Sequence, residues 1–306
     1  MTIPAPWKLL RDAVDRTQNE RWLKLVQAAA NTPYYSSGYG RALLDSLTDP
    51  SHLSRVDPVH FTRFFSGISS FRNQQSTTIP DALLHSPWGQ TRKVVAVRPW
   101  FPIESRVDIV HQATAQAVIP TRPEVVTGSV EGLCLLARDI LATGRRIDTL
   151  AFGVIVFTGI GQPIHTARHR DLFWEAFQTP VLEQLRGFQG ELLAEECEAH
   201  DGFHVNPQEA HWEQHGPDLL LTSLANLRHP VLRLITGLAG RLETSLCACG
   251  IHGARLQLET GYTENDLADV AELADALDLG SSARKGMGVR LSPSAPNRLE
   301  ITRSGS

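Results

Sequence analysis

Cysteine and histidine side chains gather in two short segments in the second half of the chain. The first, EECEAHDGFHV, contains Cys197, His200 and His204, and the second, CACG, contains Cys247 and Cys249. Three thiolates and one imidazole supplied by two turns match the ligand set of a closed tetrahedral zinc site. We therefore predict a structural zinc ion held by Cys197, His204, Cys247 and Cys249, with His200 as the alternative to His204.

Two glycines favour this interpretation. Gly202 and Gly250 lie next to the candidate ligands and give the backbone the freedom that tight turns need. Four protein ligands leave no open coordination position, so such an ion stabilises the fold and takes no part in catalysis. The alternative is that the cysteines are small buried apolar residues beside exposed histidines, because free cysteine is often buried.

Other motifs carry weaker signals. His165 and His169 are one helical turn apart, but they lack the glutamate of an HExxH metal site, which favours exposed helix histidines. The sequence contains no GxSxG elbow, no GxxxxGK[ST] phosphate loop and no GxGxxG fingerprint. The segment Gly159-Ile160-Gly161 follows an apolar run and predicts a tight turn beside a small ligand.

These residues must be positioned by four successive regions. Residues 1–90 predict an N-terminal helical segment, with its longest helix over Trp7–Ala30, and a linker. Residues 91–195 alternate strands and helices, which indicates an α/β layer with largely parallel strands. Residues 196–262 predict a small β-rich unit that contains the zinc site. Residues 263–306 predict an acidic helix and a basic tail.

The elements expected in the middle and the β-rich unit follow from short apolar runs and capping residues. The expected strands are Lys93–Val97, Glu124–Thr127, Leu150–Phe157, Phe203–Val205, Leu219–Ser223, Val231–Ile235 and Arg255–Leu258. The expected helices are Glu104–Val118, Ser129–Thr143 and His165–Phe177.

The order of several segments resembles the adenylate-forming enzymes of the phenylacetate–CoA ligase type. RWLKLVQAAANTPYYSS (Arg21–Ser37) is similar to that family's N-terminal helix, which ends in Pro-Tyr-Tyr. The strand LAFGVIVF with GQPI is similar to its strand and Gly-Glu-Pro-Leu turn, and PVLEQLRGFQGE to its Tyr-Gly-x-x-Glu segment. EECEAHDGFHVN, LLLTSLANLRHPVLRLITGLAGRL and CACG also have counterparts, so the match covers Arg21–Ser37 and roughly Pro123–Gly250. It implies the fold of a truncated N-terminal domain of such an enzyme.

The resemblance implies chemistry and a place for it. These enzymes use ATP and magnesium to convert a carboxylic acid into an acyl-adenylate, and then transfer the acyl group to coenzyme A. The implied ligand pocket lies where Gly161, Gln162 and Pro163 meet Gly187–Glu191 at the carboxyl ends of the strands, which is also where open α/β sheets bind ligands. The family's metal-containing members use zinc ligands similar to the three cysteines and one histidine above.

Individual roles follow from the same resemblance. Phe188 or Arg186 would stack on an adenine or aryl ring, with an ordinary core position as the alternative for Phe188. Glu191, or Gly190 after a one-residue slip, stands where the family binds magnesium. Arg233 remains from the family's arginine pair.

Several of the family's groups have no counterpart here. Leu238 follows Thr236-Gly237 where the family has the aspartate that binds ribose. Leucine accepts no hydrogen bond, and losing such a contact costs about 1–3 kcal/mol. Neither Ser66–Ser70 nor Ser76–Thr78 has the Gly-Thr-Thr-Gly character of the phosphate loop. The only lysine after Lys93 is Lys285, so the family's catalytic lysine and its C-terminal lobe have no expected equivalent.

Three functions remain open. The first is a non-catalytic or partner-dependent descendant that binds an acyl or adenylate-type ligand, a protein partner or a second copy of itself. The second is an active ATP-dependent ligase that forms an acyl-adenylate and a CoA thioester. The third is an enzyme of different chemistry on the same scaffold. Zinc is the expected cofactor, and ATP or AMP with magnesium belongs to the second function.

Composition excludes other classes of protein. The chain has 306 residues, 42% of them hydrophobic, and a net charge of −4 from 29 bases and 33 acids. These values argue against intrinsic disorder and against a nucleic-acid binder, which has a basic excess. The most apolar stretch, 149–161, is too short for a membrane helix, which needs about 20 residues. Four cysteines and no secretory signal predict a cytoplasmic protein.

Overall fold

The N-terminal helices begin and end where the sequence supplies caps and prolines. The computed structural model describes residues 6–76, 81–89, 92–162 and 165–259. The predicted long helix is α1 (Pro6–Ala30), and Thr32 caps the next helix, which has Pro33 in its first turn. The short helices that follow are α2 (Pro33–Gly38), α3 (Gly40–Asp45), η1 (Pro50–Arg55), α4 (Phe61–Ser66) and η2 (Ile68–Phe71). The predicted acidic helix and basic tail lie outside the described residues.

Five strands form the parallel half of the sheet, in the spatial order β3-β2-β4-β5-β6. They are β2 (Val94–Val97), β3 (Asp108–Val110), β4 (Val125–Ser129), β5 (Gly153–Gly159) and β6 (Val181–Arg186). Every residue of β2 and β5 is buried, as expected for parallel strands covered on both faces. The prediction of an α/β layer with largely parallel strands is confirmed.

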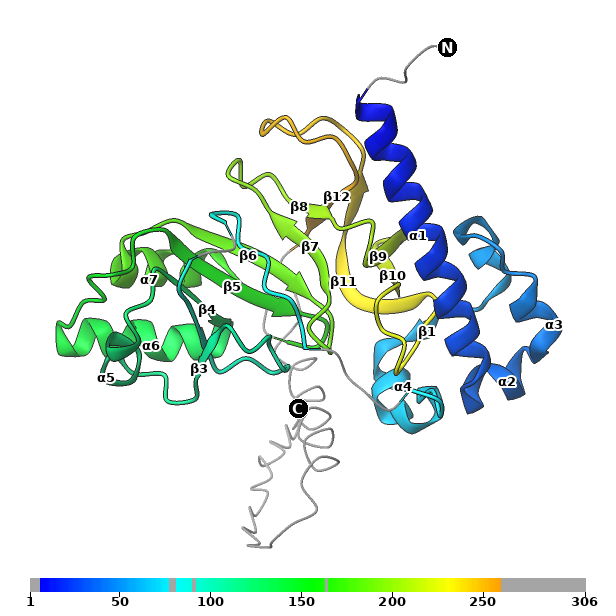
Figure 1. The fold of residues 1–306 in the computed structure, drawn as a ribbon, viewed down its shortest axis with the longest axis horizontal. Helices are drawn as coiled ribbons and strands as arrows, with labels where there is room; N and C mark the ends of the chain where they lie inside the picture. The colour runs from blue at the N-terminus through cyan, green and yellow to red at the C-terminus, as the bar shows by residue number, and fades with distance from the viewer. Residues whose placement is uncertain (1–5, 77–80, 90–91, 163–164, 260–306) are drawn as a thin grey trace, which may run out of the picture.

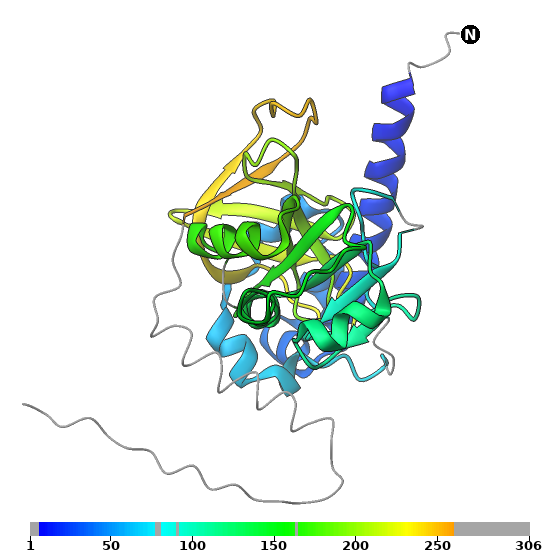
Figure 2. The ribbon, with the colours of Figure 1, turned by 90° about the vertical axis from the view of Figure 1, so that its left-hand side faces the viewer.

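The two faces of this parallel half are covered differently. Helices α5 (Ala115–Val118), α6 (Val130–Thr143) and α7 (Ala167–Phe177), with the short η3 (Ile119–Thr121), share one apolar core with the sheet. The predicted caps of α6 are present, because Ser129 accepts a hydrogen bond from the Gly132 amide and Gly144 ends the helix with a left-handed backbone. The other face packs against an irregular segment within 82–107 (Figures 1 and 2).

The predicted helix over Glu104–Val118 is wrong. Residues 108–110 of that range form β3, which pairs in parallel with β2, and only the four residues of α5 are helical. Val107 is buried against the face of the sheet opposite α5, α6 and α7, which holds the chain in an extended path. A parallel crossover usually contains a helix, but the connection from β2 to β3 has none.

The antiparallel half continues the same sheet through the order β6-β7-β8-β12-β11-β10-β9. Its strands are β7 (Leu192–Glu196), β8 (Phe203–Val205), β9 (Ala210–His215), β10 (Asp218–Ser223), β11 (Leu234–Glu243) and β12 (Arg255–Leu258), and the short β1 (Val59–His60) pairs in parallel with β11. Strand β11 is long and curved (Figure 1). Its first part pairs with β10 and its last part with β12, whereas the sequence predicted only a short strand over Val231–Ile235.

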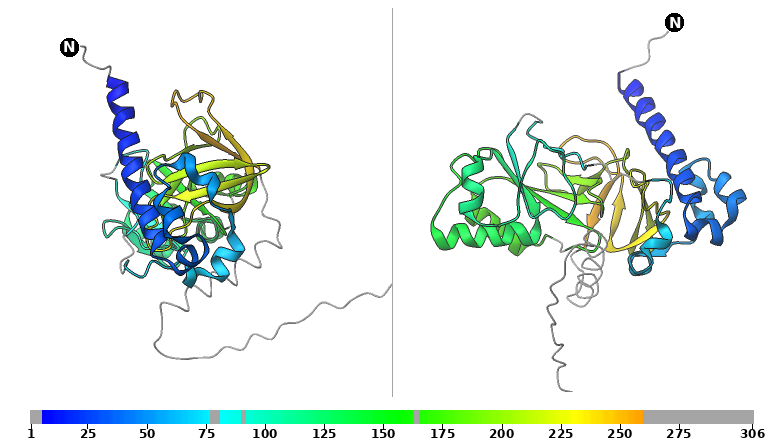
Figure 3. Two further views of the ribbon diagram at one scale, coloured as in Figure 1. Left: turned by 90° about the vertical axis from the view of Figure 1, so that its right-hand side faces the viewer. Right: turned by 60° about the horizontal axis from the view of Figure 1, so that its bottom comes forward.

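The N-terminal helices pack against this antiparallel half, at the opposite end of the molecule from α5, α6 and α7 (Figure 3). Buried Trp22 donates its indole N–H to the Leu47 carbonyl, and the hydroxyl of buried Tyr35 accepts a hydrogen bond from the Leu232 amide at 2.7 Å. The first bond ties α1 to the segment after α3, and the second attaches α2 to the segment that enters β11. In the described part of the chain, no helix has the length and apolar character needed to cross a bilayer.

Candidate ligand cavity and metal centre

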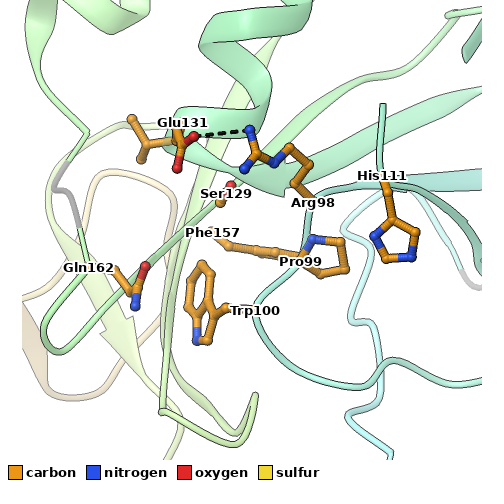
Figure 4. A pocket seen from close by; sticks show the side chains of 9 residues that line it. Arg98, Pro99, Trp100, His111, Ser129, Glu131, Phe157 and Gln162 are labelled. Carbon is orange, nitrogen blue, oxygen red and sulfur yellow. Dashed lines mark ion pairs between the residues drawn. The ribbon is translucent and has the colours of Figure 1, made fainter. Parts of the chain in front are cut away.

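A cavity of about 550 Å³ opens at the carboxyl ends of the parallel strands. The segments that follow β2, β3, β4 and β5 line it, and Figure 4 shows their side chains converging on one space. The lining residues are Arg98, Pro99, Trp100, His111, Ser129, Val130, Glu131, Phe157 and Gln162. A ligand pocket typically occupies about 300–1,000 Å³, so this cavity has the size of a metabolite site.

The first turn of α6 forms the back of the cavity. Ser129 ends β4 and caps the helix through a 3.1 Å bond from the Gly132 amide. A Cβ at Gly132 would lie 2.9 Å from the Val97 carbonyl oxygen. Because glycine has no Cβ, α6 can begin directly against the end of β2. The positive end of a 14-residue helix therefore faces the cavity, a position that favours an anion.

Charged side chains line the rim. Arg98 follows β2 with a left-handed backbone (φ 47°), and its guanidinium lies 3.0 Å from the Glu131 carboxylate (Figure 4). Non-glycine residues with such a backbone cluster at ligand sites, because the surrounding fold must impose the strain. Both side chains are exposed, so their ion pair is weak and Arg98 is free to turn toward a ligand. His111 lies on the same rim and is exposed.

Aromatic rings form the wall. The rings of Trp100 and Phe157 meet edge to face with centroids 6.2 Å apart, and Phe101 packs behind them at 5.2 Å from Phe157. The buried Arg186 guanidinium lies 5.3 Å from the Phe157 ring centre and donates to the carbonyls of Leu83 and Gly190. Burial lowers the pKa of Arg186 to about 10. Arg186 is therefore part of the core and not a surface on which a ligand ring can stack.

Most of the residues implied by the family resemblance lie away from this cavity. Gln162 lines it, and Gly161 forms the turn before it with φ 75°, while Pro163 lies outside the described residues. Gly187 and Glu191 close the hairpin between β6 and β7 through a 2.8 Å bond between their backbones. The Phe101 ring packs against Gly190, where a Cβ would be only 2.4 Å away, so the hairpin does not reach the cavity.

The side chains of that hairpin are committed to the fold. The Glu191 carboxylate accepts hydrogen bonds from the Gln189 amide at 3.0 Å and the Ser223 hydroxyl at 3.3 Å, and its burial raises its pKa. Phe188 packs with Phe64, Phe65 and His229, which is the core position left open by the sequence.

Two further residues that the resemblance singled out, Arg233 and Leu238, contact other parts of the fold and do not line the cavity. Arg233 pairs with Glu213 at 3.2 Å and donates to the Val56 carbonyl. Leu238, in place of the ribose aspartate, is 2% exposed in the core.

The sequence analysis did not identify three residues of the cavity lining, Arg98, Trp100 and His111. For Arg98 and Trp100, the sequence signal was the Val-Arg-Pro-Trp run directly after an apolar strand, where side chains reach the edge of the sheet.

Acid is expected to destabilise the region around the hairpin through His229. The Gln189 side-chain amide lies 2.9 Å from His229 Nδ1, and burial, with Arg228 and Arg72 nearby, lowers the pKa of His229 to about 4. The unfolded chain binds a proton near pH 6.5, so the unfolding free energy falls as the pH drops from about 6.5 toward 4. Urea unfolding at pH 7 and 4.5 measures this loss, which is smaller in His229→Gln. The assignment to His229 would be contradicted if the unsubstituted protein and His229→Gln lost the same unfolding free energy between pH 7 and 4.5. It would also be contradicted if His111→Gln, at the exposed rim, reduced the loss as much as His229→Gln.

The predicted zinc ligands come together between two turns. Cys197 and His204 belong to the β7–β8 turn and β8, and Cys247 and Cys249 lie in the turn between β11 and β12. Pairing of β8 with β12 brings these turns side by side. The four ligand atoms all lie within 4.8 Å of one another, with Cys197 Sγ 3.7 Å from Cys247 Sγ and Cys249 Sγ 3.4 Å from His204 Nε2.

This donor set fits zinc. A tetrahedron with zinc–sulfur bonds of about 2.3 Å has edges of about 3.8 Å, close to the observed separation of the sulfurs. Burial raises the pKa of Cys197 to about 11, and a cation at the centre of the cluster offsets that effect. His200 instead pairs with Glu196 at 2.9 Å, so His204 is the histidine that joins the cluster.

Comparison with known proteins identifies the fold. No protein-family model matches the sequence, and no curated protein matches it. Solved structures of 2-hydroxyisobutyryl-CoA ligase do match. The open conformation, in complex with 2-HIB-AMP and CoA, aligns with a TM-score of 0.57 and 15% identity over 78% of this chain and 67% of the ligase. The postadenylation state with 2-HIB-AMP aligns with a TM-score of 0.57 and 14% identity over 78% of this chain and 65% of the ligase. The thioesterification state, with 2-HIB-AMP and CoA, aligns with a TM-score of 0.57 and 15% identity over 83% of this chain and 68% of the ligase. The chain thus spans about two thirds of those ligases and has the fold of an adenylate-forming acyl-CoA ligase domain.

Proposed function

We propose that this chain is a descendant of the acyl-adenylate-forming ligases, of the phenylacetate–CoA ligase type by its motifs, that binds a carboxylic-acid or adenylate-type ligand. In this proposal it is non-catalytic by itself, or depends on a partner that completes the site. The observation that carries it is the cavity, because it lies at the carboxyl ends of the parallel strands of a ligase fold.

The chemistry of the cavity supports an anionic ligand with an apolar body. Arg98 and the N-terminal turn of α6 line one side, and each favours negative charge, while the Glu131 carboxylate on this side is paired with Arg98. His111 adds a ring that can hydrogen-bond to a ligand. Trp100 and Phe157 offer an aromatic wall on which an aryl or acyl group packs. A ligand with a carboxylate or phosphate at the N-terminal end of α6 and a hydrophobic body against the two rings would therefore match both sides of the cavity.

Loss of the groups that hold a nucleotide argues against independent catalysis. Leu238 is buried where the family places the acceptor for the ribose hydroxyls, and Arg233 is already paired with Glu213. Ser66–Ser70 spans the end of α4 and η2, where the Gly67 and Ser70 amides donate to backbone carbonyls instead of cradling phosphates. Electrostatic contacts of this kind each supply several kcal/mol in active sites.

The metal centre has a separate, structural part in this proposal. Zinc would be held by Cys197, His204, Cys247 and Cys249, which ties the β7–β8 turn to the β11–β12 turn. None of the four residues lines the cavity.

Calorimetric titration tests the binding proposal. We expect heat of binding from benzoate, phenylacetate, a short aliphatic acid or AMP, and we expect Arg98→Met to weaken the anion about tenfold, or 1.4 kcal/mol. Arg145→Met, on an exposed loop, is the matched control and leaves the dissociation constant unchanged. No heat from any of these four compounds, with the protein folded, would overturn the proposal.

A further inference from the structure

A second, smaller cavity of about 210 Å³ lies between α7, β6, the β7–β8 turn and the end of β12. It shares no lining residue with the first cavity. Its lining is His165, Arg170, Glu183, Glu196, His200, Gly202, Phe203, Gln257, Leu258 and Glu259. At about 30 Å³ per water molecule, it holds about seven waters or a compound with a similar number of non-hydrogen atoms.

Two buried side chains in this lining lack hydrogen-bond partners at one atom each. His165 Nδ1 lies 3.0 Å from Glu183 Oε2, and the two side chains are 1% and 4% exposed. His165 Nε2 and Glu183 Oε1 have no partner in the described part of the protein. When Nδ1 carries the proton that it shares with the carboxylate, Nε2 is an acceptor, so both unpartnered atoms accept hydrogen bonds. A buried acceptor without a hydrogen-bond donor is unfavourable, so these two atoms favour a ligand that donates hydrogen bonds.

The lining contains more carboxylates than arginines. Arg170 Nη2 lies 2.8 Å from Glu196 and 3.9 Å from Glu183, and His200 pairs with Glu196 at 2.9 Å. The third carboxylate of the lining belongs to Glu259, and Arg170 is its one arginine. Among the described residues, the ligand atoms placed closely enough for a metal ion belong to Cys197, His204, Cys247 and Cys249, which do not line this cavity.

We infer that this second cavity binds a small primary amine as its ammonium ion. An ammonium group carries three N–H donors, enough to reach both His165 Nε2 and Glu183 Oε1. Its positive charge offsets the excess of carboxylates, and Phe203 and Leu258 offer apolar surface to a short carbon chain. The inference does not depend on the function proposed for the first cavity.

A matched pair of ligands separates hydrogen bonding from charge. Ethanolamine and choline share a skeleton, but the quaternary nitrogen of choline has no N–H. We expect calorimetry on the full chain to detect ethanolamine and butane-1,4-diamine and to show at least tenfold weaker binding of choline. Equal affinity for choline, or no heat from either amine at 10 mM with the protein folded, would overturn the inference.

Variants locate the amine in the cavity. Glu183→Gln keeps the shape and removes the charge, and we expect it to weaken amine binding at least tenfold. If that variant does not fold, Glu259→Gln at the open end of the cavity is expected to weaken binding severalfold. Glu175→Gln, on the exposed face of α7, is the control and leaves binding unchanged. Unchanged affinity in both cavity variants would contradict the placement of the amine here.

Discussion

Replacement of Cys247 by serine is expected to release the metal and to remove the stability that the metal supplies. Cys247 is 2% exposed, and its sulfur lies 3.7 Å from that of Cys197, so a hydroxyl in its place removes a thiolate ligand from a cluster of four. A metal present at 1,000 times its dissociation constant stabilises a protein by about 4 kcal/mol, and that contribution disappears with the site. We expect about one equivalent of zinc in the untreated protein and less than half an equivalent in Cys247→Ser.

Elemental analysis and thermal unfolding measure these two effects. Cys134→Ser is the matched control, because Cys134 is a free buried cysteine in α6 outside the cluster, so its replacement leaves the zinc content unchanged. Less than half an equivalent of zinc in the untreated protein, or the same zinc content in Cys247→Ser, would contradict the proposed metal centre.

Truncation of Phe157 to alanine is expected to cost about 3–5 kcal/mol of unfolding free energy. Phe157 is fully buried in β5, and its ring contacts Phe101, Trp100 and the Arg186 guanidinium. Removing it leaves the irregular segment that covers this face of the sheet without its main apolar contact and merges the void with the ligand cavity. Urea denaturation at pH 7 gives the change.

The control for Phe157 lies across the same cavity. His111 lines the rim but is exposed, so His111→Ala is expected to change the unfolding free energy by no more than about 0.5 kcal/mol. A loss below 1 kcal/mol in Phe157→Ala would mean that the aromatic wall is not part of the core.

Local signals in the sequence identified much of the fold. Ser129 and Gly144 bound α6 as predicted, and short apolar runs located β2, β5, β8 and β12. Strand β9 was missed because four of the six residues of Ala210–His215 are polar and only Ala210 and Trp212 are buried, which is a weak strand signal. The helix expected near Glu104 failed because Val107 and the pairing of β3 with β2 depend on contacts distant in sequence.

The metal centre and the cavity differ in how far sequence could predict them. Residue type and spacing predicted that Cys197, His204, Cys247 and Cys249 come together, and their ligand atoms lie within 4.8 Å of one another; that they hold zinc stays a proposal. The cavity depends on where four strands end together, which spacing alone does not reveal. The family resemblance placed the ligand where Gly161, Gln162 and Pro163 meet Gly187–Glu191. Phe101 packs against Gly190 in the β6–β7 hairpin, and of the described residues in these two segments Gln162 lines the cavity.

The central claim, that the isolated chain binds a ligand but does not activate it, is tested most directly by pyrophosphate release. The purified protein would be incubated with ATP, magnesium and a panel of aryl and aliphatic acids, with and without coenzyme A. We expect no pyrophosphate above the protein-free background for any acid. The reason is that a buried leucine, Leu238, stands where the family resemblance places the aspartate that binds ribose. Acid-dependent pyrophosphate release by the chain alone would contradict the central claim and show that the chain is an active ligase.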